Sequence, residues 1–152
     1  MMMLAMASQT TAQVPVDAPH LPTGPLAYAG AFGTTRLYVD TASWERSDLP
    51  NLVRGTAVIT TSQGPAPVQT VLMWIDCGRR VYQLSSGRAY DEAGLEIAST
   101  TYLPDQAIGD DGPVKQLADS VCVTPFAFGT EAVDNWRAAL QDTRAAAQGE
   151  AR

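Results

Sequence analysis

The sequence predicts an α+β protein: an antiparallel sheet of about five to six strands, a helix packed on that sheet, and a further C-terminal helix. Three observations predict this class. Segments rich in β-branched and alternating apolar residues follow one another between residues 35 and 103. Two segments with helical apolar spacing come after them. The chain has 152 residues, enough for one domain with one core. Strands in a run followed by helices are typical of this class.

The first 13 residues, MMMLAMASQTTAQ, are interpreted as the end of a secretory signal peptide. They carry no charge, and Ala5-Met6-Ala7 fits an A-x-A cleavage pattern. The basic n-region is missing and the apolar stretch is short, so we expect a truncated signal. The alternative is a disordered, Met-rich tail. The signal interpretation predicts an exported protein, located in the periplasm or at the cell surface.

Residues 14–32 are predicted to form a Pro-rich, flexible leader. VPVDAPHLPTGPLA holds four prolines, which fix φ and donate no N–H. His20 is therefore expected in solvent. The folded domain is expected to cover residues 33–128, and residues 129–152 are expected to form a helical extension.

Five strand segments are expected before the helices. The third segment is apolar on both faces, as a central strand should be. A tight turn at Gly78, whose glycine suits a positive φ, joins it to the fourth. Gly55, in the second segment, indicates a bulge or a bend. The segments are residues 35–40, 52–62, 68–77, 79–91 and 95–103.

Two helices are expected after a polar loop at residues 105–112. Pro113 fits the first turn of a helix that ends at Cys122. The last helix is expected over residues 130–147, with Thr130 as its N-cap. The apolar face of the first helix comprises Val114, Leu117 and Val121.

The two cysteines, Cys77 and Cys122, lie 45 positions apart, one at the end of a strand and one at the end of a helix. In an exported chain such a pair favours one disulfide over two buried free thiols or a reactive thiol. His20 is the only histidine, so a zinc site lacks ligands and a catalytic thiol lacks a partner base. A bond between the cysteines would fasten the helix to the sheet.

No catalytic constellation is apparent, and we predict neither enzyme activity, nor a cofactor, nor a metal. The chain holds no GxSxG, HExxH, P-loop or dinucleotide-binding glycine pattern. Asp40, Asp76 and Asp91, each near a strand end, are the carboxylates considered for acid–base work. Hydrogen bonding within turns is the competing interpretation.

The charge pattern argues against nucleic acids and membrane spans. The formal net charge is -6, and the ten basic residues are scattered. Binding phosphates requires a clustered basic patch, so no nucleic-acid partner is expected. No run of eighteen apolar residues exists, so no transmembrane segment is expected.

Four side chains are candidate contacts for a protein partner: Trp44, Arg46, Arg79 and Arg80. Trp44 lies in a polar turn, and an exposed aromatic side chain near arginines is typical of a contact hot spot. The alternative is that Trp44 covers the edge of the core. Arg79 and Arg80 alternate along the fourth strand, so one faces each side of the sheet. One of them is expected to pair with Asp76 or Asp91. Trp74 is expected in the core.

Four segments carry a family resemblance through their order: YVDTASWER (38–46), MWIDCGRRVYQL (73–84), YDEAG (90–94) and VKQLADSVC (114–122). Together they resemble the surface-adhesin protein E-like family of exported bacterial proteins, over roughly residues 36–123. The resemblance implies an antiparallel sheet with a packed helix, a Cys77–Cys122 bond between them and a cell-envelope setting. For the founding adhesin type, it implies binding of host extracellular-matrix and serum glycoproteins.

We therefore expect an exported, non-enzymatic binding protein that acts through protein–protein contact. A periplasmic small-ligand carrier or an enzyme, using carboxylates and arginines near strands three and four, is an alternative. A dimeric envelope subunit, joined through a sheet face or an edge strand, is another. A deep pocket lined by Asp76, Arg79 or Asp91 would favour the carrier or enzyme, and a flat sheet face the binding module.

Overall fold

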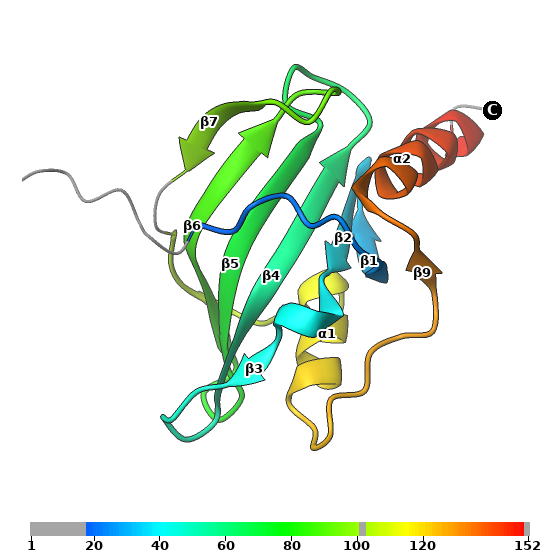
Figure 1. Ribbon diagram of the computed structural model, residues 1–152. Coiled ribbons are helices and arrows are strands. Elements are labelled where there is room, and N and C mark those ends of the chain that lie inside the picture. The colour runs from blue at the N-terminus through cyan, green and yellow to red at the C-terminus, as the bar shows by residue number, and fades with distance from the viewer. Residues whose placement is uncertain (1–17, 101–102, 151–152) are drawn as a thin grey trace, which may run out of the picture.

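The computed structural model describes residues 18–100 and 103–150 (Figure 1). Over these residues the chain forms one antiparallel sheet, two α-helices and a short 3-10 helix. The predicted α+β class is confirmed, although the sheet has nine strands instead of five to six. The elements are β1 (Leu26–Phe32), β2 (Thr35–Val39), η1 (Thr41–Ser43), β3 (Glu45–Arg46), β4 (Leu52–Thr61), β5 (Val68–Asp76), β6 (Val81–Tyr90), β7 (Glu96–Thr100), β8 (Leu103–Ala107), α1 (Pro113–Val121), β9 (Ala132–Val133) and α2 (Trp136–Glu150).

Three long strands, β4, β5 and β6, form the centre of the sheet, with β5 in the middle. The sheet continues from β4 through β2 and β1 to β9, while β7 and β8 pair with opposite ends of β6. The β4–β5 register runs without a shift from Leu52 opposite Asp76 to Thr60 opposite Val68. Gly55 lies inside this regular stretch, so no bulge occurs at this glycine in the β4–β5 pair.

A strand replaces part of the expected leader. Residues 26–32 form β1, in which Leu26 and Ala27 are buried. The prolines end at Pro25, and the apolar residues that follow can therefore donate backbone N–H groups to a sheet. The leader prediction is wrong for residues 26–32, and the folded part of the chain begins before Gly33.

The strands and helices after β6 have other boundaries than expected. The segment predicted as one strand over residues 95–103 contains β7 and the first residue of β8. β8 extends to Ala107 and so takes up the start of the predicted polar loop. Thr130 does not begin a helix, because the chain first pairs with β1 as β9. Asn135 is the residue that caps α2: its Oδ1 accepts a hydrogen bond from the backbone N–H of Ala138 at 3.0 Å.

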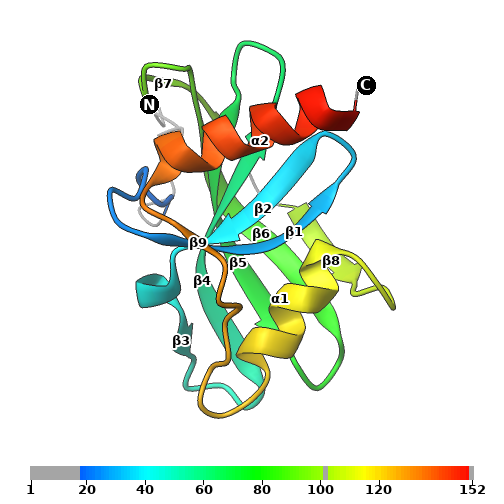
Figure 2. The same cartoon turned by 90° about the vertical axis from the view of Figure 1, so that its right-hand side faces the viewer.

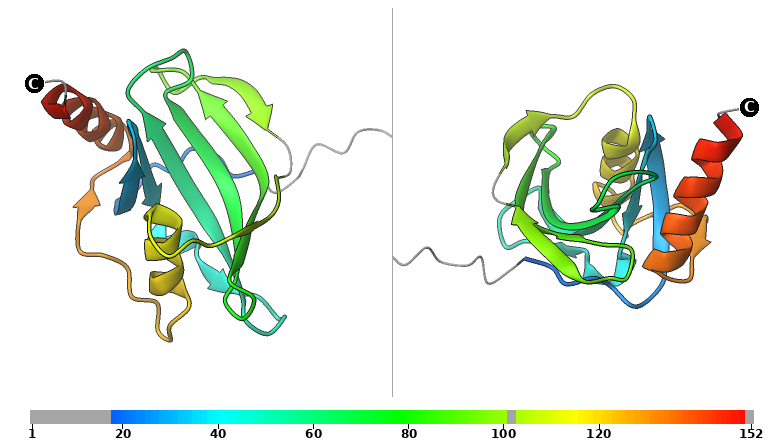
Figure 3. Two further views of the ribbon diagram at one scale, coloured as in Figure 1. Left: turned by 180° about the vertical axis from the view of Figure 1, so that it is seen from behind. Right: turned by 90° about the horizontal axis from the view of Figure 1, so that it is seen from above.

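Alternate side chains of the central strands face different helices. On one side of β5, Met73 and Ile75 belong to a core cluster with Leu117 of α1. On the other side, Val68 belongs to a cluster with Trp136 of α2. The right-hand view of Figure 3 shows α1 inside the curve of the sheet and α2 outside it, beside β1 and β2. We call these two sides the inner face and the outer face.

The Cys77–Cys122 disulfide is present and joins the inner-face helix to the sheet. The two Cα atoms lie 5.6 Å apart. Cys77 directly follows β5, and Cys122 is the C-cap residue of α1, so the bond connects the ends of these two elements. From Cys122 the chain passes through β9 to the start of α2, as Figure 2 shows.

A pair of buried hydroxyl groups connects α2 to the outer face. Thr60 of β4 and Thr143 of α2 are 0% and 1% exposed, and their oxygens lie 2.5 Å apart. The hydroxyl of Thr143 donates to the carbonyl oxygen of Ala139, so the hydroxyl of Thr60 donates to Thr143. The buried Thr60 hydroxyl therefore depends on Thr143 for its acceptor, whereas Thr143 also bonds the backbone of its own helix.

We expect Thr143→Val to lower the free energy of unfolding by about 1 to 3 kcal/mol, because the buried Thr60 hydroxyl would lose its acceptor. Urea unfolding followed by tryptophan fluorescence measures the change. Thr143→Ser, which keeps a hydroxyl, serves as the control. A double Thr60→Val, Thr143→Val variant should recover most of the loss, because no unpaired hydroxyl remains. Equal losses in the double and single variants would contradict this reasoning.

Candidate functional site

Among the residues that the structure describes, the side chains of the outer face are only half-buried at the end of the sheet near residues 77–80. Trp74 lies there on the middle strand, opposite Arg54 of β4 and Gln83 of β6. Leu52 and Val81 lie beside it, each opposite Asp76. All five side chains are half-buried. We call this surface, made of Leu52, Arg54, Trp74, Val81 and Gln83, the Trp74 face.

Trp74 was expected in the core, and that prediction is wrong. Strand alternation points its neighbours Met73 and Ile75 toward α1, so the indole points to the outer face. The cluster packed under α2 involves the other end of that face, around Val58 and Val68. The indole of Trp74 is therefore only partly covered.

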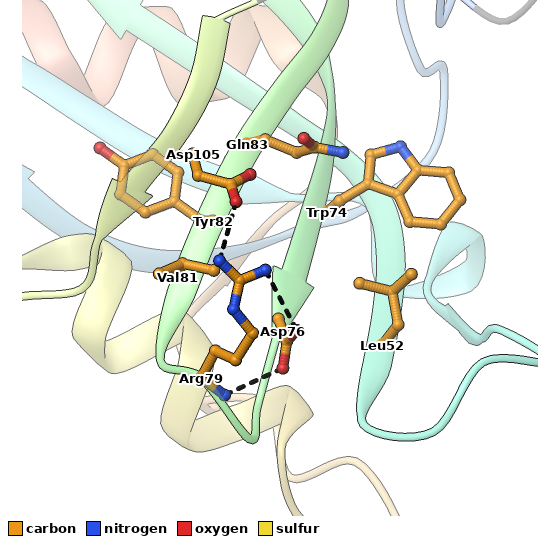
Figure 4. Close-up of a pocket in the computed structure, with 8 residues that line it drawn as sticks. All are labelled: Leu52, Trp74, Asp76, Arg79, Val81, Tyr82, Gln83 and Asp105. Carbon is orange, nitrogen blue, oxygen red and sulfur yellow. Dashed lines mark hydrogen bonds and ion pairs between the residues drawn. The ribbon is translucent and has the colours of Figure 1, made fainter.

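Beside Trp74 the outer face is hollowed, with a volume of about 370 Å³ (Figure 4). Figure 4 shows the indole of Trp74 on one side of the hollow and Arg79 with two aspartates on the other. A guanidinium N–H of Arg79 donates to Oδ2 of Asp105 at 3.2 Å. The other Arg79 terminal nitrogen lies 4.0 Å from Oδ2 of Asp76. The lining residues are Leu52, Trp74, Asp76, Arg79, Val81, Tyr82, Gln83 and Asp105.

The charged side of the hollow is positioned by the four-residue turn between β5 and β6. Oδ1 of Asp76 accepts hydrogen bonds from the backbone N–H groups of Gly78 and Arg79, both at 3.0 Å. The positive φ of this turn belongs to Arg80 (56°) and not to Gly78, which corrects the expected turn geometry. Because β6 begins at Val81, neither arginine lies in the strand.

The two arginines nevertheless extend in different directions. Arg79 lines the outer hollow, whereas Arg80 lies 3.9 Å from a carboxylate oxygen of Asp119 on α1. The Arg79–Asp105 and Arg80–Asp119 ion pairs both involve exposed side chains, so each contributes little to the stability of the fold. Of these two arginines, only Arg79 lies beside the Trp74 face.

Arg54 and Glu45 orient the indole from beside the hollow. The Arg54 guanidinium lies 5.1 Å from the centroid of a Trp74 ring, within the range of a cation–π contact. The same guanidinium forms an ion pair with Oε1 of Glu45 on β3 at 2.6 Å. A cation over the indole restricts the rotation of the ring, so the side chain needs little ordering before it binds.

The two other residues predicted to contact a partner, Trp44 and Arg46, interact with residues on the inner side of the sheet. Trp44 is 6% exposed and packs in the α1 cluster, so the alternative in which it covers the core is the one the structure adopts. Arg46 donates to the carbonyl oxygen of Val123 at 2.7 Å and lies over the ring of Phe126. Neither residue is part of the Trp74 face.

The carboxylates considered for acid–base work are not brought together. Asp76 and Asp91 lie at opposite ends of β6, a strand of ten residues, which spans roughly 30 Å. Oδ1 of Asp91 accepts the backbone N–H groups of Ala93 and Leu95, so it orders a turn. Within the described ranges, no three His, Cys, Asp or Glu side chains form a group able to hold a metal ion.

A second hollow of about 370 Å³ lies where β2, β9 and α2 meet. Arg36 lies over the ring of Tyr28 there, 4.9 Å from its centroid. Hydrogen bonding to Tyr38 raises the pKa of Arg36 above its ordinary value, so this group stays charged. Glu131 and Asp142 also line this hollow, so together with Arg36 its lining is negative overall.

Residue alternation contains a signal that would have located Trp74. Trp74 and Asp76 are two positions apart in one strand, so they share a face. The charged side chain of Asp76 at the end of that strand must contact solvent, so Trp74 is expected on the more solvent-exposed face. Arg54, Gln83 and Asp105 had no such signal, because they come from other strands and meet Trp74 only through the register of the sheet.

In the part of the chain that the structure describes, no helix is long and apolar enough to cross a membrane. Comparison with family models, curated proteins and solved structures gave no match to this chain.

Proposed function

We propose that this protein is an exported, non-enzymatic binding protein of the cell envelope, which contacts a protein partner through the Trp74 face. Host extracellular-matrix glycoproteins are the partner class that the resemblance to the surface-adhesin protein E-like family implies. The observation that carries the proposal is a half-buried tryptophan with two arginines beside it on an open sheet face. A disulfide, typical of oxidising compartments, supports the exported setting.

The composition of the Trp74 face agrees with contact surfaces in general. Tryptophan and arginine are enriched among the residues that dominate binding energy. Leu52 and Val81 add apolar surface around the indole. Arg54 pairs with Glu45 and Arg79 with Asp105, so this surface presents charged groups of both signs next to its apolar side chains.

We expect Trp74→Ala to weaken binding to an immobilised matrix glycoprotein by about 30-fold, the effect of losing about 2 kcal/mol at a hot spot. Surface plasmon resonance at physiological salt, over a panel of matrix and serum glycoproteins, measures the affinity. The matched control is Ile97→Ala, which removes an exposed apolar side chain on β7 at the other end of the sheet. Wild-type binding no stronger than that of an unrelated acidic protein would rule the proposal out.

The hollow itself favours a second candidate, a carrier of small ligands. Its volume of about 370 Å³ lies in the range of small-molecule sites, and Asp76 and Arg79 line it. Such sites usually enclose most of the ligand, whereas the Arg79 side chain is 67% exposed. Isothermal titration with free metabolites, at concentrations up to millimolar, tests the carrier. A saturable heat with a metabolite, combined with no binding to any glycoprotein, would favour it over the contact surface.

A further inference from the structure

We infer that the hollow beside Trp74 is a subsite for a neutral pyranose unit of a glycan. The indole would lie against the C–H face of the sugar, while Asp76, Arg79, Gln83 and Asp105 would bond its hydroxyl groups. The inference rests on the proposed function, because it names the part of the glycoprotein partner that the Trp74 face recognises.

A pyranose ring requires a site with one apolar wall and one polar wall, and the hollow has both. The sugar ring presents C–H groups on its faces and hydroxyl groups around its rim. An aromatic face with its negative quadrupole attracts such weakly polarised C–H groups. Figure 4 shows the Trp74 indole on one side of the hollow, the Arg79 cluster on the other and Gln83 between them. The apolar and polar demands of one sugar ring are thus met on facing walls.

The polar wall retains hydrogen-bonding capacity of both kinds. A guanidinium has five N–H donors, and the Arg79 side chain uses one of them in a hydrogen bond, to Asp105. Oδ1 of Asp105 accepts no hydrogen bond from the residues that the structure describes. Each sugar hydroxyl both donates and accepts, so it can bridge a donor of Arg79 and an acceptor of Asp105 at once.

The charges of the lining favour a neutral sugar over an acidic one. Asp76 and Asp105 carry two negative charges and Arg79 one positive charge, so the lining is negative overall. The whole chain has a formal net charge of -6. A sialylated or sulfated glycan would bring a further negative charge toward two carboxylates, and like charges at an interface are unfavourable. Neutral hexoses avoid this repulsion, and their hydroxyl groups can still form hydrogen bonds with the polar side chains of the hollow.

The position of the hollow also suits an outward-projecting glycan. It lies on the uncovered part of the outer face, and its walls come from β4, β5, β6, β8 and the turn between β5 and β6. Paired strands hold these side chains at set distances, and Arg54 with Glu45 restrains the indole. A single sugar ring at the end of a glycan chain can enter without movement of the protein backbone.

Three probes test the inference on the full-length protein: the tightest-binding glycoprotein of the panel, the same glycoprotein after enzymatic removal of its glycans, and its released neutral oligosaccharides. We expect deglycosylation to weaken binding by at least about tenfold, and the released oligosaccharides to compete with the intact glycoprotein. Asp105→Asn, which keeps the side-chain shape, should weaken oligosaccharide binding, and Ile97→Ala should not.

The outcomes separate the inference from the proposed function. Undiminished binding of the deglycosylated partner, with loss of binding in Trp74→Ala, would overturn the glycan subsite and leave the contact surface intact. Preferential binding of sialylated over neutral oligosaccharides would overturn the choice of a neutral sugar. Binding of released oligosaccharides without any binding of glycoproteins would support the chemistry of the hollow and overturn the proposed function. Absence of binding to all three probes would overturn both.

Discussion

Removal of the Cys77–Cys122 bond, by a double Cys77→Ala, Cys122→Ala substitution, is expected to lower the free energy of unfolding by about 4 kcal/mol. The two residues are 45 positions apart. In the chain-entropy model, opening a loop of this length returns about 4 kcal/mol of conformational entropy to the unfolded chain. Urea unfolding, followed by circular dichroism, gives the change in free energy from the midpoint and slope.

Loss of the disulfide should reduce local stability most in α1. This helix has only nine residues, which is too short to persist alone in water. Leu117, Ala118 and Val121 hold it against the inner face, and Arg46 holds the chain after it through the carbonyl of Val123. Amide exchange should therefore rise more in α1 than in β5 when the bond is absent.

Reduction provides the control for the disulfide prediction. Adding a thiol reductant to the wild-type protein should reproduce the loss of stability, and the same reductant should leave the double-alanine variant unchanged. A loss below about 1 kcal/mol would show that the noncovalent contacts of α1 hold the helix in place without the bond.

Gly55→Ala is expected to lower the free energy of unfolding by about 3 kcal/mol, at the upper end of the usual effect of overpacking a core. A Cβ at this position would lie 2.3 to 2.5 Å from three ring atoms of Trp44. Trp44 is 6% exposed and sits in the inner core, so its ring has little room to move away. The glycine is thus needed for close approach of an indole to the strand.

A double-mutant cycle separates this clash from any other effect of the substitution on the strand. Trp44→Leu removes the ring that the new Cβ would meet, so Gly55→Ala should be far less harmful in that background. Gly24→Ala is the matched control, because a Cβ there meets nothing within 4 Å. Equal penalties for Gly55→Ala in both backgrounds would contradict the proposed contact.

Local patterns were enough to locate most of the sheet and the inner helix. The expected segments 52–62 and 68–77 agree with β4 and β5 to within one residue at either end. Pro113 begins α1 as the sequence indicated, because proline suits a first helical turn. These features depend on residues close together in the chain, where apolar spacing and backbone restrictions act directly.

The errors occur where a distant segment decides the outcome. β1 forms because β2 and β9 supply hydrogen-bonding partners on its two edges. β9, in turn, delays the start of α2 from Thr130 to Trp136. In both places the local composition allowed another structure, and pairing with a remote strand determined the observed one.

The side-chain environments divide in the same way. Both Trp44 and Trp74 have an arginine a few residues further along the sequence. Trp44 is nevertheless buried against Gly55, whereas Trp74 lines the outer hollow. The strand register brings Arg54 to Trp74, and the return of β8 along β6 brings Asp105 to Arg79.

By itself, the sequence determined the α+β class, the central strands, the inner helix and the pair of cysteines available for a bond, because these follow from apolar periodicity and residue chemistry over short distances. Only the tertiary structure decided which tryptophan is buried, which carboxylate each arginine pairs with and where the described part of the sheet is left partly exposed. Those outcomes depend on register and on the placement of α2, which bring together residues far apart in the chain.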